Sequence, residues 1–298
     1  MGKVHVTYYK QRNTNTPTIV QDYNISRLKL ASCCFRVTES KNKLSQILAS
    51  IGKSIIVYHL LKNKGGRFVK SDEYDCTDPT EKAVYSYYLG MATCKWVSEE
   101  LFNIPHLQYL SLARNGAYKN TISGNTCPDL IGKDKNGDIW ILEAKGTHGH
   151  FNGNQIRAGK NQLNNITVLN KIKAAIVTES YFDHDQYSIY AEDPEINGED
   201  LLNYNDDLVI QQYYKNIIML LESQNIKNGN ELIFEYQTYI DGRKSIVEIG
   251  LNEQIFNAYS KQNYEEIRTI TDKFEPNTDN DDNKYISSDG ISFKIKIV

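Results

Sequence analysis

The chain has 298 residues, 40% of them hydrophobic and 24% charged, which is ordinary for a globular protein of one large domain or two. No apolar run approaches the length of a membrane span, and Met1 to Lys10 lack a secretory leader. The five cysteines are odd in number and show no Cys-x-x-Cys spacing, which argues for reduced thiols and against structural zinc. We therefore expect a cytoplasmic protein with no membrane partner.

Residues 1–78 are expected to form an N-terminal α/β addition. Lys3 to Tyr9 is predicted to be a strand, and Ser40 is the expected cap of a helix. The inner face of that helix carries Leu44, Ile47, Leu48 and Ile51. A short apolar run, Ile55 to Leu61, and a basic turn follow.

A long helix is predicted over Glu81–Phe102, where apolar residues recur at three- and four-residue spacing. Thr80 is its expected N-cap, and Pro79 precedes that cap. A strand over His106–Ala113 is expected next. A loop rich in Asn, Gly and Ser then leads to Asn125.

A β-hairpin is predicted to join Pro128-Asp129 to Glu143-Ala144-Lys145, with its turn at Asp134-Lys135-Asn136-Gly137. A two-residue Asn136-Gly137 loop would place Asp129 opposite Ala144, on the wrong face. A type I turn with Gly137 as a left-handed bulge places Asp129 opposite Glu143 instead. Asp at the first position of the turn and Gly at the fourth favour this second register.

The second strand of this hairpin alternates its side chains between two faces. Glu143 and Lys145 share one face with Ile139 and Ile141. The other face carries Trp140, Leu142 and Ala144. Both faces are largely apolar, as expected for a strand that is covered on both sides.

Two carboxylates and an ammonium in one patch suit a divalent cation that acts on a phosphodiester. Asp129, Glu143 and the main-chain carbonyl of Ala144 would hold Mg²⁺ or Mn²⁺ through oxygen atoms. The cation would acidify water and neutralise charge on the phosphate. Lys145 would orient or deprotonate the attacking water, or stabilise the transition state. The alternative is a structural ion-pair cluster. An EF-hand loop is excluded because Ile139 stands where Gly is required.

The pattern Pro128-Asp129, thirteen residues, Glu143-Ala144-Lys145 resembles the motif of the PD-(D/E)XK nuclease superfamily, the restriction-endonuclease-like fold. The resemblance covers about Thr80 to Pro194, so we expect the nuclease core over residues 79–195. It implies an α+β core that runs helix, three antiparallel strands, helix, strand, with N- and C-terminal additions. It also implies that Asp129 and Glu143 are the metal ligands and that Lys145 is the catalytic lysine.

The elements after the lysine fit this order. A helix over Asn154–Asn170 and strands over Ala174–Thr178 and Gln186–Ala191 would complete the core. Residues 196–298 are expected to form a C-terminal α/β addition, packed on the core or separate. Its predicted elements are a helix over Asp206–Gln224, a hairpin over Leu232–Gly250 that turns at Asp241-Gly242, a helix over Glu253–Ser260 and a strand over Ile291–Val298.

The resemblance implies two further features. The first is an extra acidic ligand on the first helix, for which Glu81 is the candidate and Glu99 and Glu100 are alternatives. The second is a glutamine on the helix after the lysine, here Gln162, with Arg157 and Lys160 touching phosphates. Ordinary exposed polar residues are the alternative in each case. His148 and His150 are expected to be loop residues over the substrate.

We therefore expect a metal-dependent endonuclease that acts on DNA, in restriction or bacterial anti-phage defence. The alternatives are an RNA-directed nuclease and a catalytically silent nucleic-acid- or protein-binding module on the same fold. A net charge of −3 is unusual for a protein that grips duplex DNA through its phosphates. A local basic face around Arg157, Lys160, Lys171 and Lys173, a homodimer or an activating partner subunit would then supply that contact.

Overall fold

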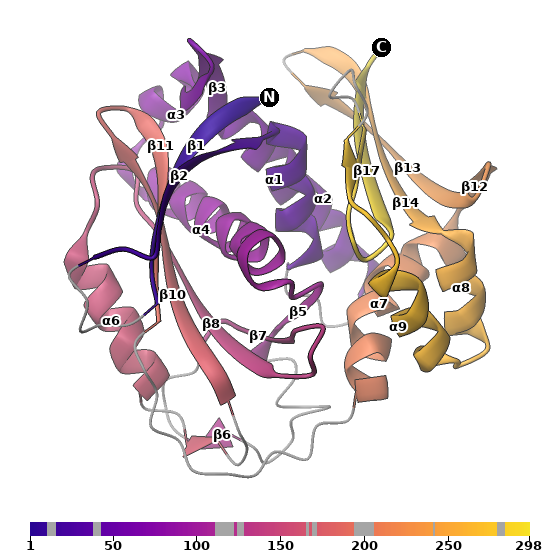
Figure 1. Ribbon diagram of the computed structural model, residues 1–298. Coiled ribbons are helices and arrows are strands. Elements are labelled where there is room, and N and C mark those ends of the chain that lie inside the picture. Colours follow the sequence, from indigo (N-terminus) through magenta and orange to yellow (C-terminus); the bar gives the residue numbers. More distant parts are fainter. Residues whose placement is uncertain are drawn as a thin grey trace.

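The computed structural model describes residues 1–10, 16–37, 43–110, 122–123, 128–164, 167–168, 172–193, 206–240, 242–278 and 284–298. Over these residues the protein is a mixed α+β structure with two large sheets, each covered by helices (Figure 1). None of the described helices is long and apolar enough to cross a membrane. Ser40, Asp241 and Lys171, which carried predictions, lie outside the described residues.

The first sheet has nine strands. Their bounds are β1 Gly2–Tyr9, β2 Ile19–Ile25, β3 Leu61–Lys64, β4 Arg67–Lys70, β5 His106–Tyr109, β7 Leu130–Lys133, β8 Ile139–Gly146, β10 Ile172–Asp183 and β11 Gln186–Glu192. The order across the sheet is β2-β1-β4-β11-β10-β8-β7-β5, with β3 paired to β4. Strands β5, β7 and β8 are antiparallel neighbours, and β10 runs parallel to β8. β1 also pairs in parallel with β11, so the N-terminal segment extends the same sheet.

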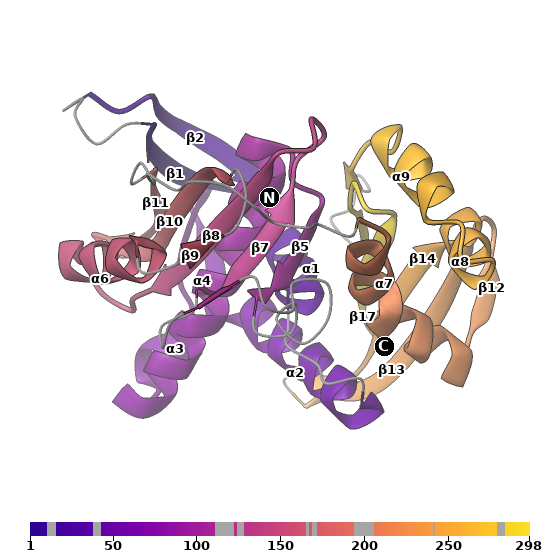
Figure 2. The ribbon, with the colours of Figure 1, turned by 90° about the horizontal axis from the view of Figure 1, so that it is seen from below.

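Two helices sandwich the centre of this sheet. Helix α4, Pro79–Phe102, covers one face, and helix α6, Gly153–Asn164, covers the other (Figures 1 and 2). Apart from the two-residue strands β6 (Ile122–Ser123) and β9 (Thr167–Val168), the chain order from α4 through β5, β7, β8 and α6 to β10 is helix, three antiparallel strands, helix, strand. The remaining helices of this half are α1 Arg27–Arg36, α2 Leu44–Leu60 and the short α3 Asp72–Cys76.

The C-terminal part forms a second, six-stranded sheet in the order β12-β13-β14-β17-β16-β15. Its strands are β12 Ile226–Asn228, β13 Glu231–Ile240, β14 Arg243–Asn252, β15 Asn277–Thr278, β16 Lys284–Ile286 and β17 Ile291–Ile297, and its helices are α7 Asp206–Ser223, α8 Glu253–Ser260 and α9 Tyr264–Asp272. The predicted hairpin, the predicted helix at Glu253–Ser260 and the terminal strand are confirmed here. Two short strands, β6 (Ile122–Ser123) and β9 (Thr167–Val168), pair with each other in a separate small sheet.

Burial on both faces of β8 confirms the pattern of its residues. Trp140, Leu142 and Ala144 pack into the apolar cluster beneath α4. Ile139 and Ile141 pack into the cluster beneath α6. Alternation along one strand thus fixes which side chains face α6.

Several predicted boundaries are wrong. Helix α4 is capped by Asp78, not Thr80. The Asp78 carboxylate accepts a hydrogen bond from the main-chain N–H of Thr80 at 2.7 Å, and Pro79 lies in the first turn of the helix. Helix α6 ends at Asn164 rather than Asn170, since β9 begins at Thr167.

Other corrections concern the first strand and the second helix. Strand β5 ends at Tyr109, and the rest of the segment expected to Ala113 lies largely outside the described residues. The cap position of α2 is Lys43, which makes no side-chain cap. The apolar run from Ile55 forms the end of this helix, which reaches Leu60, and Leu61 begins β3.

A buried cluster of charges joins the two halves of the molecule. The Arg36 guanidinium of α1 donates to Glu99 Oε2 of α4 at 3.0 Å and to Asp289 Oδ2 of the C-terminal part at 2.9 Å. Lys95 Nζ lies 3.1 Å from Glu99 Oε1. Burial acts to raise the pKa of Asp289, yet Arg36 and Lys95 hold it well below its ordinary value. We call Arg36, Lys95, Glu99 and Asp289 the interdomain charge cluster.

Candidate functional site

The hairpin of β7 and β8 has the register that its turn residues predict. Lys133 pairs with Ile139 and Leu130 with Leu142. Gly137 has φ +87°, and its N–H donates to the Asp134 carbonyl at 3.0 Å. The Asp134 carboxylate also accepts from the Asn136 N–H at 2.9 Å, which stabilises the turn. The type I turn with a left-handed glycine is therefore confirmed.

This register brings Asp129 and Glu143 together. One step beyond the Leu130–Leu142 pair places Asp129 opposite Glu143. The Asp129 N–H donates to Glu143 Oε2 at 3.2 Å, and the Ala144 N–H donates to Asp129 Oδ2 at 2.9 Å. Glu143 is only 1% exposed. The two carboxyl groups therefore lie close together, beside the main chain of Ala144.

Lys145 joins the same group from the next position on this face of β8. Its Nζ forms an ion pair with Glu143 Oε1 and donates to Gln162 Oε1 of α6 at 2.7 Å. The lysine side chain is 20% exposed, so it lies between the buried carboxylate and solvent. Four of the predicted site residues, Asp129, Glu143, Lys145 and Gln162, therefore meet in one place.

Glycines let both helices approach β8 closely. A Cβ atom at Gly159 of α6 would lie 3.2 Å from Glu143 Cγ and 2.8 Å from Val177 Cγ1. On the opposite face, a Cβ atom at Gly146 would lie 2.0 Å from the carbonyl oxygen of Ser86 in α4. A larger residue at either position would push a helix away from the strand that carries the site.

Burial is the main influence on the pKa values of the two carboxyl groups. Burial, with the nearby Asp129 carboxylate, raises the pKa of Glu143 to about 7. Burial also raises the pKa of Asp129, although the Ala144 N–H and Lys145 oppose that shift. One lysine only partly compensates two buried carboxylates, so the site favours an additional positive charge or a proton.

The donor set fits a hard divalent cation. Asp129 and Glu143 offer carboxylate oxygens, which accept hydrogen bonds from the Ala144 and Asp129 N–H groups respectively. Among the described residues, no group of three or more His, Cys, Asp and Glu side chains is arranged to hold a metal. A cation held here would therefore depend on these two carboxylates, with water completing its coordination.

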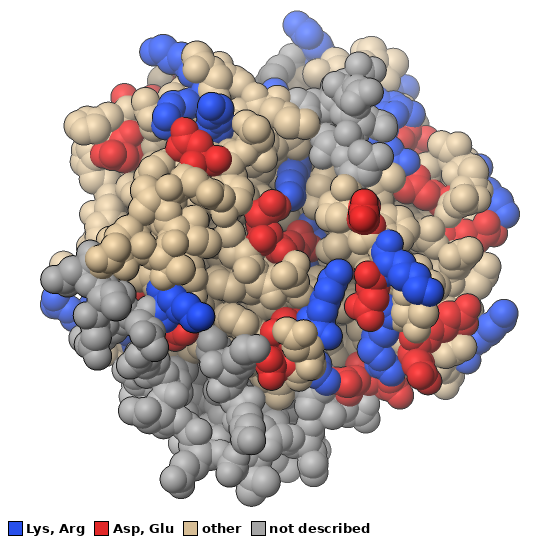
Figure 3. Space-filling model, in the orientation of Figure 1, with Lys and Arg blue, Asp and Glu red and all other residues tan. Residues whose placement is uncertain are grey.

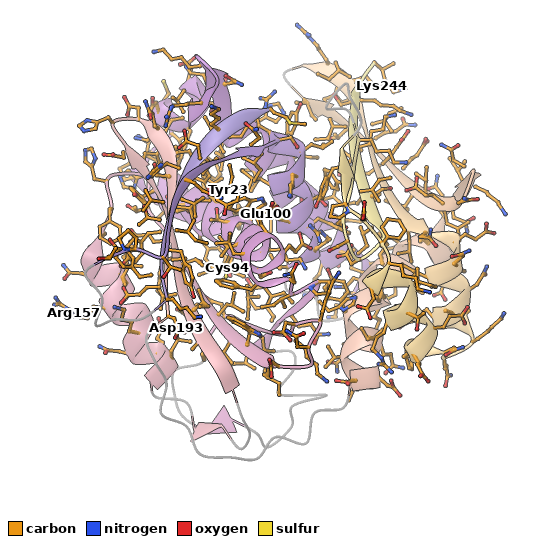
Figure 4. The ribbon with its side chains drawn as sticks, in the orientation of Figure 1. Tyr23, Cys94, Glu100, Arg157, Asp193 and Lys244 are labelled. Carbon is orange, nitrogen blue, oxygen red and sulfur yellow. The ribbon has the colours of Figure 1, made fainter. Side chains whose placement is uncertain are left out.

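The other predicted site residues lie elsewhere. Glu81 is exposed at the start of α4, where its N–H donates to the cap residue Asp78 at 3.3 Å. Cys94 of α4 lies between the helix and the sheet (Figure 4) and hydrogen-bonds with Thr178. Burial raises the pKa of Cys94, and Asp129 and Glu143 are near enough for their charges to raise it further. Glu99 belongs to the interdomain charge cluster, and Glu100 pairs with Lys29 at 2.8 Å.

Two predicted phosphate contacts on α6 differ from each other. Arg157 is exposed and extends from the outer side of the helix (Figure 4). Lys160 forms an ion pair with Glu192 of β11, and the Tyr190 hydroxyl also donates to Glu192 at 2.8 Å. His148 and His150 are exposed in the segment after β8, as expected of loop residues.

Sequence reasoning missed Glu179, the cross-strand neighbour of Lys145 in the β8–β10 pair. Glu179 is 0% exposed; its Oε1 accepts from the Asn152 N–H at 3.1 Å, and its Oε2 has no hydrogen-bond partner within the described part of the chain. Burial raises its pKa to about 7. The predicted strand ended at Thr178, whereas β10 runs to Asp183. Carrying the alternation one residue further would have placed Glu179 on the face of the site.

No protein-family model, curated protein or solved structure gives a significant match to this chain.

Proposed function

We propose that this protein is a Mg²⁺- or Mn²⁺-dependent nuclease that hydrolyses phosphodiester bonds of DNA. The observation that supports this most is the meeting of Asp129, Glu143 and Lys145 at one point of the sheet. The order helix, three antiparallel strands, helix, strand around that point agrees with a restriction-endonuclease-like fold, which we propose for the half that carries the site.

Asp129 and Glu143 would hold the cation, together with the carbonyl of Ala144. When bound, the cation would neutralise charge on the scissile phosphate and favour ionisation of water. Lys145, fixed by Gln162 at 2.7 Å, keeps a positive charge beside the reacting phosphate and can orient the attacking water through Nζ. Helix α6 and the buried face of β8 limit access of bulk water to Glu143, which strengthens each of these interactions.

A catalytically silent binding module on the same fold is the second candidate. It is favoured by the internal pairing of the site, since Glu143 already pairs with Lys145, and Asp129 already accepts from Ala144. In that case the three residues would be a structural cluster, and adding a divalent cation would change neither DNA integrity nor stability.

Cleavage assays separate the two candidates. Purified protein is incubated with supercoiled plasmid, linear duplex, single-stranded DNA and RNA, in Mg²⁺, Mn²⁺ or EDTA. The nuclease proposal expects cation-dependent cleavage that Glu143→Gln and Asp129→Asn each reduce by at least about 10²-fold, with little change in thermal stability. Glu231→Gln is the matched control, because Glu231 is also a glutamate paired with a lysine, Lys284, but is half-buried and lies in the C-terminal sheet.

The biological setting and the partner are further proposals. We propose a cytoplasmic role in restriction or anti-phage defence, by a homodimer or with an activating subunit. Phage plating on cells that express wild type or Glu143→Gln tests the role. Light scattering with and without DNA tests the assembly. Equal plating efficiency for both proteins would oppose the defence proposal.

A further inference from the structure

A row of three paired residues leads from the candidate site to an aromatic cluster. Lys145 of β8 pairs with Glu179 of β10, and Glu179 pairs with Tyr190 of β11. Directly paired residues share one face of a sheet, and neighbouring strands lie ~4.8 Å apart, so Tyr190 stands about 10 Å from Lys145 on the same face.

Four aromatic side chains gather at the far end of this row. The Phe151 ring lies 4.8 Å from the ring of Tyr190 and 5.6 Å from that of Tyr181. The Tyr190 ring in turn lies 5.4 Å from that of Tyr9. We call Phe151, Tyr181, Tyr190 and Tyr9 the Phe151 stack. Phe151 remains 42% exposed, so the outermost ring of the stack offers an open aromatic surface to solvent.

The segment that carries Phe151 is tied to β10. The Thr147 N–H donates to the Ser180 carbonyl at 2.9 Å, and the Phe182 N–H donates to the Gly149 carbonyl at 2.9 Å. Immediately after Phe151, the Asn152 N–H donates to Glu179 Oε1 at 3.1 Å. These bonds hold an exposed aromatic ring in a fixed place, so little conformational entropy would be lost when a flat ligand stacks on it.

Charge around the stack favours bases over phosphates as the main contact. Lys160 is neutralised by Glu192, and the whole chain carries a net charge of −3. On the described part of the face in Figure 3, Lys and Arg are interspersed with Asp and Glu rather than gathered into a broad basic area. Both duplex and single-strand binding draw on phosphate neutralisation, but only an unpaired base can add stacking on an aromatic ring, which tolerates any sequence.

We propose that the Phe151 stack is a subsite for an unpaired nucleobase, and that the substrate is therefore single-stranded DNA or an unpaired stretch within DNA. A base close to the scissile phosphate stacks on Phe151 while that phosphate lies at Lys145. The proposal rests on the nuclease function proposed above and narrows its substrate class.

Binding without cleavage tests the subsite independently of catalysis. Fluorescent single-stranded DNA, the same sequence as a duplex, and the matching RNA are titrated with protein in EDTA. The proteins are wild type, Phe151→Ala, Phe151→Trp and Tyr239→Ala, the last a control because Tyr239 is 75% exposed in the C-terminal sheet. A second single strand carries 2-aminopurine, whose fluorescence falls when it stacks on an aromatic ring.

The expected result is tighter binding of single-stranded DNA than of duplex. Loss of stacking in Phe151→Ala weakens that binding at least about fivefold and relieves the 2-aminopurine quenching. Phe151→Trp retains binding, and Tyr239→Ala behaves as wild type. Equal binding of single strand by wild type and Phe151→Ala, tighter binding of duplex, or a preference for the RNA strand would each overturn the proposal.

The two proposals fail in different ways. If Phe151 governs single-strand binding but no DNA is cut in Mg²⁺ or Mn²⁺, the subsite stands and the hydrolytic function falls. If cutting depends on Glu143 but binding ignores Phe151, the nuclease stands and the subsite falls.

Discussion

Lys145 and Gln162 form a hydrogen bond, 2.7 Å from Nζ to Oε1, that links the central strand β8 to helix α6. Lys145 Nζ also pairs with the buried Glu143. If Glu143 binds a cation instead, the hydrogen bond to Gln162 would still hold the ammonium group in place. An amide acceptor does this without adding another negative charge to two crowded carboxylates.

Gln162→Leu is therefore expected to lower the cleavage rate by about tenfold, near 1.4 kcal/mol of transition-state stabilisation, with a small change in melting temperature. Steady-state cleavage and thermal unfolding are measured together. Gln155→Leu, at the start of the same helix, is the control. Equal rates for wild type and Gln162→Leu would show that the lysine needs no such support.

Cation binding is expected to release protons and to strengthen as pH rises from about 6 to 8. The pKa of Glu143 is raised to about 7, so in the absence of a cation the group holds a proton through much of this range. A divalent cation competes with that proton. Calorimetric titration with Mn²⁺ in two buffers of different ionisation enthalpy measures the release. Glu143→Gln should abolish it, and pH-independent affinity would contradict the expectation.

Glu179→Gln is expected to stabilise the fold at pH 8 but not at pH 4.5. Burial raises the folded-state pKa of Glu179 to about 7. Below the pKa that Glu179 has in the unfolded state, the group is protonated in both states and its burial as a charge costs nothing. Between that pKa and 7, the unfolded state loses its proton first, so the free energy of unfolding falls as pH rises. The amide keeps the acceptor for Asn152 and removes a penalty on the order of 1–3 kcal/mol. Urea unfolding at both pH values measures the difference, and an equal effect at each would contradict this origin.

Arg36→Met is expected to cost about 3–5 kcal/mol, because it leaves Glu99 and Asp289 buried without their shared cation. The contrasting control is Arg268→Met, whose partner Asp207 is more than half exposed, so its loss should cost less than about 1 kcal/mol. Chemical denaturation compares the two variants. A loss for Arg36→Met no larger than that of the control would mean that the cluster does not stabilise the native state.

Local chemistry made the hairpin predictable from sequence. The register depended on Asp134 and Gly137, which act within one turn, and alternation along β8 then fixed the faces of Glu143 and Lys145. Helix α1 was not predicted, because buried residues such as Leu28, Leu30 and Cys33 occur all around it and leave no clear apolar stripe.

Long-range contacts could not be predicted in this way. The ion pair between Lys160 and Glu192 could not be predicted from the sequence, because it depends on how α6 lies relative to β11. The same holds for Arg36 and Asp289, which are 253 positions apart. To predict that Glu179 is buried, one would have to know both how far β10 extends and where the segment after β8 lies.

The interdomain charge cluster also bears on how the chain is made. Arg36, Lys95 and Glu99 alone leave one excess positive charge in the interior, and balance comes only with Asp289, which follows Glu99 by 190 positions (289 − 99). During synthesis, the helices that carry the first three residues leave the ribosome long before that counter-charge exists. Charge balance in the docked cluster therefore requires that translation has passed Asp289.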